Sequence, residues 1–144
     1  MKILIMGLPG SGKTTLAEAL ARELKCVHFN ADDIRKNINK DLGFSVDDRI
    51  EHARRMGHLC DVAAKWGAHV IADFVCPTEA TREAFGAQFI IWVDRIQEGR
   101  FEDTNKLFEP PMKVDVRITA LHDTSFPAYH SEEIIQILKK KCGY

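Results

Sequence analysis

The sequence predicts an α/β fold, in which a doubly wound parallel sheet of about five strands carries helices on both faces. Two observations predict it. Short apolar runs alternate with segments of helical periodicity along the chain. The first run is followed at once by a glycine-rich turn and then by a helical pattern. Such alternation implies a parallel sheet that binds ligands at the carboxyl ends of its strands.

Five short apolar runs are expected to form the strands of this sheet. Each contains β-branched or aromatic residues, which favour a pleated and buried surface, and the last run is the weakest of the five. The predicted strands are residues 2–6, 26–29, 68–74, 88–93 and 114–119.

Three longer segments predict the helices that cover the sheet. Residues 13–25 carry a mostly apolar face at steps of three and four. A second helix is expected to be capped by Asp47 and to end at Gly67, because apolar residues recur at helical spacing between them. The last helix is expected to begin at Ser131, which two glutamates follow, and it has lysines near its end.

Length and composition predict a single domain over residues 1–144, large enough for one hydrophobic core and too small for two. A formal net charge of −1 argues against electrostatic binding to duplex nucleic acid or to an anionic membrane. The apolar start is far too short for a signal peptide or a membrane span. Four separated cysteines without a CxxC pair favour reduced thiols in a cytoplasmic protein, and the six histidines show no metal-binding spacing.

Residues 7–14, GLPGSGKT, match the phosphate-binding loop (P-loop) pattern GxxxxGK(S/T) between a predicted strand and a predicted helix. Glycines let successive backbone N–H groups turn toward phosphate oxygens, and the helix N-terminus adds a favourable dipole. Lys13 is expected to reach the β- and γ-phosphates of ATP, and Thr14 to help hold Mg²⁺. The expected nucleotide-binding residues are Gly7, Leu8, Pro9, Gly10, Ser11, Gly12, Lys13, Thr14 and Thr15.

Two adjacent carboxylates, Asp32 and Asp33, follow the second predicted strand, whose end should face the P-loop. A carboxylate there can orient and deprotonate an attacking hydroxyl, or position Mg²⁺ through water. The alternative is capping of a helix over 33–39, which needs only one of the pair. Arg35 and Arg49 would bind an anionic acceptor, or would simply lie in solvent.

Three blocks of the sequence resemble adenylylsulfate kinase: GLPGSGKTTLAEAL, FNADDIRKNINKDLGFSVDDRIEHARRMG and ADFVCP. Members of that family are P-loop kinases of sulfate assimilation, which transfer the γ-phosphate of ATP to the 3′-hydroxyl of adenylyl sulfate. The resemblance runs from Met1 to about Arg82, and GRFEDTNKLFEPP at 99–111 is a later echo of the family. It implies a P-loop kinase fold, ATP and Mg²⁺ as cofactors, and a small anionic acceptor as the partner.

The resemblance also implies roles for individual residues. Asp32 occupies a position suited to the catalytic base or to contact with Mg²⁺, beside the catalytic Lys13. Arg35 and Arg49 match the arginines that bind the phosphosulfate end of the substrate. The expected aromatic pair on the two faces of the adenine is Phe44 and Phe101.

Several residues depart from the family pattern. Asn30 replaces a family aspartate, His52 replaces a substrate-binding asparagine, and Cys76 replaces a serine that becomes phosphoserine in some members. Asp73 stands where the family has a small residue, at the end of the third predicted strand. Other P-loop kinases carry their Mg²⁺-associated acid there. The expected metal-binding residues are therefore Thr14, Asp32 and Asp73.

The largest departure is an absence between the fourth and fifth predicted strands. Only twenty residues, 94–113, connect them where the family inserts a basic lid, and Arg95 and Arg100 are the arginines left in this segment. The sequence therefore predicts a shortened lid. A neighbouring subunit of a homodimer could supply the missing cover.

Two alternatives to adenylylsulfate kinase activity stay open. The first is a related P-loop kinase that acts on another hydroxyl, on a nucleotide or a modified nucleic acid. Asn30, His52 and the short lid favour it, whereas the arginines and phenylalanines oppose it. The second is a nucleotide-binding protein without transfer activity, against which the complete set of Lys13, Thr14 and Asp32 argues.

Overall fold

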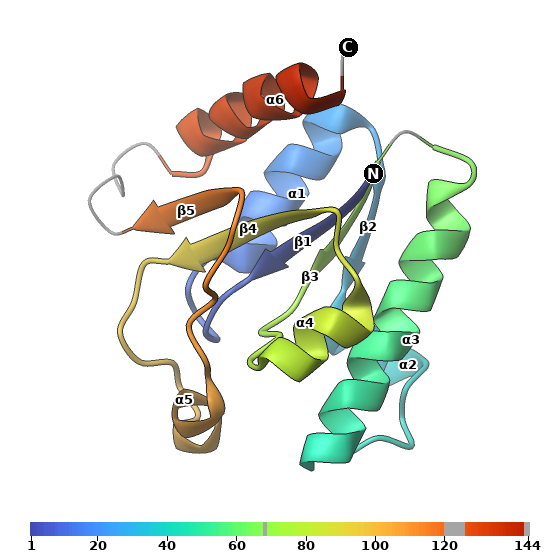
Figure 1. The fold of residues 1–144 in the computed structure, drawn as a ribbon, viewed down its shortest axis with the longest axis vertical. Helices are drawn as coiled ribbons and strands as arrows, with labels where there is room; N and C mark the ends of the chain where they lie inside the picture. Colours follow the sequence, from blue (N-terminus) through green and yellow to red (C-terminus); the bar gives the residue numbers. More distant parts are fainter. Residues whose placement is uncertain (68, 120–125, 143–144) are drawn as a thin grey trace.

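The computed structural model describes residues 1–144 except 68, 120–125 and 143–144 (Figure 1). Its centre is a five-stranded sheet in the order β2-β3-β1-β4-β5, and all four neighbouring pairs are parallel. The strands are β1 (Lys2–Met6), β2 (Val27–Asn30), β3 (Val70–Asp73), β4 (Phe89–Asp94) and β5 (Val116–Thr119). The predicted parallel sheet is therefore confirmed, with strand ends that differ from the prediction by a few residues.

Helices cover both faces of the sheet, as the sequence predicted (Figure 1). Successive strand residues point to opposite faces, so Ile3 and Ile5 pack in one apolar core with α1 and α6. Leu4 and Met6 pack in a second core with α2, α3 and α4. The helices are α1 (Lys13–Leu24), α2 (Ala31–Asn37), α3 (Val46–Ala64), α4 (Glu79–Phe85), α5 (Glu102–Leu107) and α6 (Ala128–Cys142).

The ends of the long helix α3 differ from the prediction. Ser45, rather than Asp47, is its N-cap, because the Ser45 hydroxyl accepts a hydrogen bond from the backbone N–H of Asp48 at 3.1 Å. The helix ends at Ala64, before the predicted stop at Gly67. An aspartate in the first turn still interacts favourably with the helix dipole, so the residue type carried a correct signal at a shifted position.

The closing helix α6 begins at Ala128, three residues before the predicted start at Ser131. Ser131 is buried inside the helix, and its hydroxyl donates to the backbone oxygen of Ala128 and to the Glu23 carboxylate of α1, both at 3.1 Å. A serine hydroxyl can bond within a helix turn as well as cap it, which explains the wrong start.

Two short helices, α4 and α5, were not predicted. They have seven and six residues, too few to show helical periodicity. The N-terminus of α4 did carry a signal, because Thr78 and Thr81 form a capping box and Gly86 ends the helix in a left-handed conformation.

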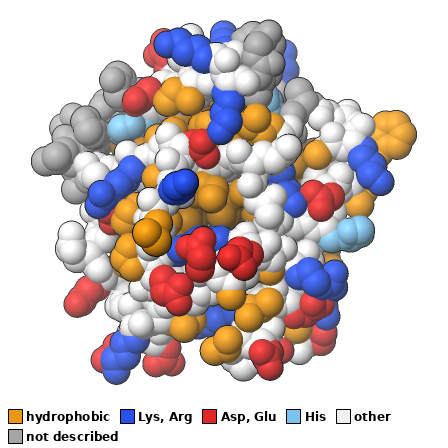
Figure 2. Space-filling model, in the orientation of Figure 1, with side chains coloured by type: hydrophobic (Ala, Val, Ile, Leu, Met, Phe, Trp, Pro, Cys, Tyr) orange, Lys and Arg blue, Asp and Glu red, His pale blue; other side chains and the backbone are white. Residues whose placement is uncertain are grey.

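The surface seen in Figure 2 carries acidic and basic side chains interspersed, with hydrophobic side chains gathered in a recess near its middle. This face therefore has no continuous basic surface of the kind that binds duplex nucleic acid. Among the helices that the structure describes, none is long and apolar enough to cross a membrane.

Candidate active site

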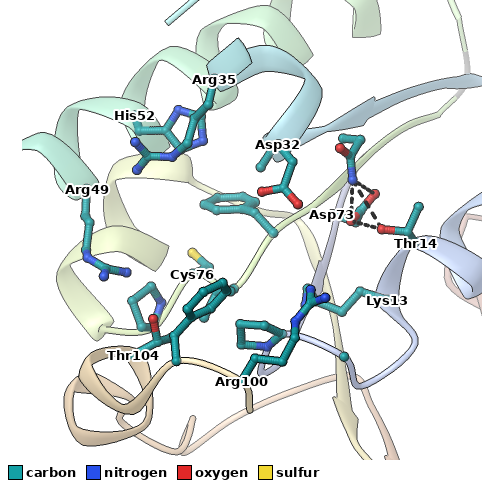
Figure 3. Close-up of a pocket in the computed structure, with 18 of the residues that line it drawn as sticks. Lys13, Thr14, Asp32, Arg35, Arg49, His52, Asp73, Cys76, Arg100 and Thr104 are labelled. Carbon is teal, nitrogen blue, oxygen red and sulfur yellow. Dashed lines mark hydrogen bonds between the residues drawn. The ribbon is translucent and has the colours of Figure 1, made fainter. Parts of the chain in front are cut away.

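A cavity of about 690 Å³ opens at the carboxyl ends of the strands, between the P-loop, α2, α3 and the segment around α5. Most of the predicted site residues line it (Figure 3). The predicted residues on its wall are Pro9, Gly10, Gly12, Lys13, Thr14, Thr15, Asp32, Arg35, Phe44, Arg49, His52, Asp73 and Phe101. The P-loop residues Gly7, Leu8 and Ser11 are not part of this wall.

The P-loop connects β1 to α1 and places Lys13 at the first turn of the helix. Gly12 is the N-cap of α1 with φ of 103°, and a Cβ atom there would lie 2.5 Å from Nη1 of Arg95. The Lys13 ammonium donates to the backbone oxygen of Leu8 at 3.0 Å. Burial lowers the pKa of Lys13 to about 8, and the charges of Asp73 and Asp32 oppose this shift. A bound phosphate would supply the negative charge that this buried ammonium favours.

Asp73, at the end of β3, is the centre of a hydrogen-bonded group at the floor of the cavity. It is only 2% exposed, and its Oδ1 accepts from the Thr14 hydroxyl at 2.9 Å and from Nδ2 of Asn30 at 3.1 Å. The Asn30 amide also reaches the Thr14 hydroxyl at 3.2 Å. The imidazole of His28 contacts Oδ2 of Asp73. The structure thus places the carboxylate of β3 directly beside the hydroxyl of the P-loop.

His28 is a member of this group that the sequence analysis missed. It lies two residues before Asn30 on β2, so the two side chains project from the same face of the strand. That spacing was a usable signal, since a polar side chain two positions before a predicted site residue should point the same way.

The two carboxylates that follow β2 have different positions. Asn30 is the N-cap of α2, because its side-chain oxygen accepts from the backbone N–H of Asp33 at 3.0 Å. The expected alternative, in which an aspartate caps a helix over 33–39, is therefore wrong: the helix covers 31–37. Asp32 lines the cavity and Asp33 does not. In the view of Figure 3, the Asp32 carboxylate lies between the Thr14–Asp73 pair and the side of the cavity that carries Arg35.

Arg35 and Arg49 hold the loop that carries Phe44. Arg35 donates to the backbone oxygen of Gly43 at 2.8 Å, and Arg49 donates to that of Phe44 at 3.0 Å. Their guanidinium carbons lie 4.4 Å and 5.4 Å from the centroid of the Phe44 ring. Burial and the like charge of Arg49 lower the pKa of Arg35, as expected for a cation without a neutralising anion.

The two predicted aromatic residues reach the cavity from different elements. Phe44 belongs to the loop before α3 and Phe101 is the N-cap residue of α5. Their side chains are strongly exposed, at 68% and 58%, although both border the cavity. Large apolar side chains rarely stay this exposed in a cavity wall without a ligand to cover them.

His52 lies on α3 at the same side of the cavity as Arg35 (Figure 3). It is buried, and its Nδ1 lies 2.9 Å from the amide nitrogen of Asn39. Burial lowers the pKa of His52 to about 4, and the positive charges of Arg35 and Arg55 lower it further in the same direction. The imidazole is therefore neutral near pH 7.

Cys76 follows β3 and lines the cavity, fully buried, with a left-handed φ of 46°. Burial raises the pKa of its thiol to about 12, so the thiol is protonated near pH 7.

The short connection between β4 and β5 is anchored beside the cavity. The buried Arg82 of α4 donates to the backbone oxygens of Cys76, Pro77 and Glu109, and its guanidinium lies 5.6 Å from the Phe108 ring centroid. Of the two arginines expected in this segment, Arg100 lines the cavity. Arg95 donates to the backbone oxygen of Ser11 in the P-loop at 2.9 Å.

Comparison with known proteins relates this site to one enzyme family. Residues 1–93 match the family model described as adenylylsulphate kinase. The adenylyl-sulfate kinase of Bacillus velezensis is 43% identical over 84 residues, which are 55% of this chain and 43% of that protein. The chain thus matches less than half the length of this curated relative. The echo at 99–111 lies outside the family match and stays a prediction.

Solved structures show the same fold over nearly the whole chain. The Mycobacterium tuberculosis APS kinase, solved in complex with AMPPNP and APS, has a TM-score of 0.74 at 22% identity and covers 96% of both chains. Shikimate kinase from Aquifex aeolicus has a TM-score of 0.65 at 17% identity and covers 99% of this chain and 98% of its own. At these identities the likeness shows the fold alone.

Proposed function

The chain belongs to the adenylylsulphate kinase family, and we propose that it transfers the γ-phosphate of ATP to the 3′-hydroxyl of adenylyl sulfate. One observation carries the proposal. A single cavity wall combines the P-loop with a carboxylate, two arginines and two exposed phenylalanines. Many P-loop kinases share the fold, so the acceptor side of the cavity has to select the substrate.

The donor side of the cavity suits ATP. Successive backbone N–H groups of the P-loop and the N-terminus of α1 favour the phosphates. Lys13 adds a partly desolvated positive charge, which is most stabilising where negative charge develops on the transferring phosphoryl group.

Mg²⁺ fits the oxygen atoms beside the P-loop. Thr14 and Asp73 offer a hydroxyl and a carboxylate 2.9 Å apart, the hard oxygen ligands that this ion prefers. The described side chains form no cluster of three His, Cys, Asp or Glu residues. Mg²⁺ in kinases commonly uses one or two protein groups, and phosphates and waters complete its shell. When bound, the ion would neutralise charge on the phosphates, and Asn30 and His28 would hold Asp73 in place.

Asp32 is proposed as the residue that orients the attacking hydroxyl. It would accept the 3′-hydroxyl proton while that oxygen forms a bond to the γ-phosphorus. The bond between the γ-phosphorus and the bridging oxygen then breaks, and ADP leaves with that oxygen. Lys13 would stabilise the charge on the phosphoryl group during this step.

The acceptor side suits a purine nucleotide with an anionic end. Phe44 and Phe101 would stack on the two faces of the adenine, each contributing roughly 1–3 kcal/mol. Arg35 and Arg49 keep further N–H donors after their contacts with loop carbonyls, and these donors suit the phosphosulfate group.

A second candidate function is phosphorylation of a different hydroxyl, on a nucleotide or a modified nucleic acid. The position of Asp73 favours it, because a carboxylate at the end of β3, bonded to the P-loop hydroxyl, is the arrangement of other P-loop kinases. The exposed phenylalanine pair favours adenylyl sulfate instead.

The test offers ATP labelled on its γ-phosphate to adenylyl sulfate, to nucleosides and to oligonucleotides with free hydroxyls. Adenylyl sulfate should be the preferred acceptor. Phe44→Ala and Phe101→Ala should each raise the KM for adenylyl sulfate by roughly tenfold or more, with little change in the KM for ATP. Trp66→Ala is the matched control, since Trp66 is an exposed aromatic residue outside the cavity. Preference for another acceptor would refute the proposal.

A further inference from the structure

We propose that His52 determines acceptor specificity by donating a hydrogen bond from Nε2–H to a lone pair of the acceptor molecule. Asn39 and Arg55 are proposed as positioning residues that determine which ring nitrogen carries the proton. The inference rests on the proposed function, because it concerns the acceptor side of the same cavity.

The first observation is an unpaired polar atom in the cavity wall. His52 is only 3% exposed, yet it lines the cavity. Its Nε2 is buried and has no hydrogen-bond partner among the described residues. Buried polar groups in native proteins are nearly always paired, and leaving one unpaired is unfavourable. In a cavity wall, the missing partner is most simply an atom of the ligand.

The second observation assigns the proton to Nε2. Nδ1 of His52 lies 2.9 Å from Nδ2 of Asn39, and an amide nitrogen can only donate. Nδ1 must therefore be the bare, accepting nitrogen. A neutral imidazole carries one N–H, so its proton is on Nε2. The unpaired atom is thus a hydrogen-bond donor.

The third observation explains why the Asn39 amide keeps this orientation. Nη1 of Arg55 donates to Oδ1 of Asn39 at 3.3 Å, so the amide nitrogen must face His52. The reversed amide would place two donors against each other. Arg55 is itself held by Asp41 at 2.8 Å and 2.9 Å, and by Glu51 at 2.8 Å.

The charge state of His52 agrees with this assignment. Burial and the nearby Arg35 and Arg55 keep the pKa of the imidazole near 4, so it is neutral when the enzyme works near pH 7. A neutral N–H in a buried wall discriminates between a lone pair and a C–H group at the same place on the acceptor, because the C–H group leaves the donor unpaired. The adenine ring nitrogens and ribose oxygens of adenylyl sulfate carry such lone pairs.

Calorimetric binding of adenylyl sulfate tests the hydrogen bond. His52→Phe removes both ring nitrogens, and we expect its Kd to rise about 5- to 150-fold. His52→Gln keeps an N–H donor near the position of Nε2, so its Kd should stay within about fivefold of the wild type. His69→Phe is the matched control, because His69 is a buried histidine that does not line the cavity. Equal binding by wild type and His52→Phe would overturn the proposal.

Nitrogen NMR of the ligand-free protein with ¹⁵N-labelled histidine tests the tautomer. The wild type should show a bare Nδ1 and a protonated Nε2, and the opposite pattern would overturn the proposal. Asn39→Asp replaces the amide donor with a carboxylate that accepts, so the proton should appear on Nδ1. We expect this variant to lose as much affinity for adenylyl sulfate as His52→Phe does.

These measurements separate the two proposals. If wild type binds adenylyl sulfate and His52→Phe binds it equally well, the His52 proposal fails and the proposed function stands. If wild type phosphorylates a different acceptor, the proposed function fails. The effect of His52→Phe on the KM of that acceptor, together with the NMR tautomer, then supports or overturns the role of His52.

Discussion

Asp73 and Asp32 are two carboxylates in one cavity with different surroundings. Asp73 is buried against the Thr14 hydroxyl, the Asn30 amide and the His28 imidazole. Asp32 lines the cavity without a hydrogen bond to any described residue. A carboxylate held by several donors suits a fixed metal contact, whereas a free one suits proton transfer.

The two carboxylates should therefore fail in different ways. Asp32→Asn should lower kcat by roughly 10²–10⁴-fold with little change in the affinity for Mg²⁺ and ATP, because a positioned general base is lost. Asp73→Asn should weaken the affinity for Mg²⁺ by roughly 10–100-fold. Steady-state kinetics and Mg²⁺ titrations of nucleotide binding measure the two effects, with Asp33→Asn as the control outside the cavity. A mild Asp32→Asn with a strongly reduced kcat in Asp73→Asn would reverse the assignment.

Lys13 should take up a proton when ATP binds in alkaline solution. Burial lowers the pKa of Lys13 to about 8 in the empty site, and a bound phosphate raises it because an opposite charge favours the protonated amine. At pH 8.5 the empty site is mostly neutral, so binding requires a proton; at pH 6 the lysine is already charged and uptake should vanish. Calorimetry in two buffers of different ionisation heat measures the uptake.

Lys13→Arg is the matched control for this titration, since a guanidinium stays charged in both states. It should show no pH-dependent uptake attributable to this position. Equal uptake by the wild type and the arginine variant would show that a different group titrates.

At the scale of elements, α3 and α4 approach each other so closely that one glycine is required. A Cβ atom on Gly57 of α3 would lie 2.5 Å from the backbone oxygen of Phe85 at the end of α4. The other side of this contact cannot yield easily, because it is main chain. The approach positions α3, which carries Arg49 and His52.

Gly57→Ala should destabilise the protein by roughly 1–3 kcal/mol, the usual range for overpacking, despite a gain of about 1 kcal/mol in helix propensity. Urea unfolding measures the change. Gly67→Ala is the control, because its Cβ would meet only the His69 backbone oxygen at 3.8 Å. A Gly57→Ala protein as stable as the wild type would show that the helices can separate without penalty.

At the scale of the whole molecule, the cavity has little cover on its nucleotide side. The β4–β5 connection contributes Arg100, Phe101 and Thr104 to the wall. Figure 1 shows it as a loop with one short helix, α5, at the edge of the molecule. Kinase lids exclude water and bring arginines to the developing charge, so a short lid should favour hydrolysis of ATP.

We therefore expect slow turnover in dilute solution, with ATP hydrolysis that is appreciable relative to transfer. Loss of a charge-stabilising arginine can cost about 10³–10⁵-fold in rate. If a homodimer supplies the missing cover, activity per chain should rise with protein concentration. ADP and phosphorylated product are measured together across a dilution series. Fast, tightly coupled transfer at every concentration would mean that the short segment is a sufficient lid.

Sequence patterns were sufficient for the features that depend on neighbouring residues. Each strand of the sheet is a local apolar run, and the P-loop is eight consecutive residues between a strand and a helix. The same local information placed Asp32 after β2 and Asp73 at the end of β3. Because parallel strands present their carboxyl ends at one edge, these residues could be expected to share a cavity.

Side-chain pairings between distant residues required the folded chain. His28 meets Asp73 across 45 positions of sequence, and Arg55 reaches Asn39 across 16. Such contacts depend on strand register and helix packing, which small changes in a sequence pattern do not reveal. The tautomer of His52 follows from one of these pairings. Residue types and short spacings therefore predicted the kind of site, whereas the orientation of each polar group arose from packing.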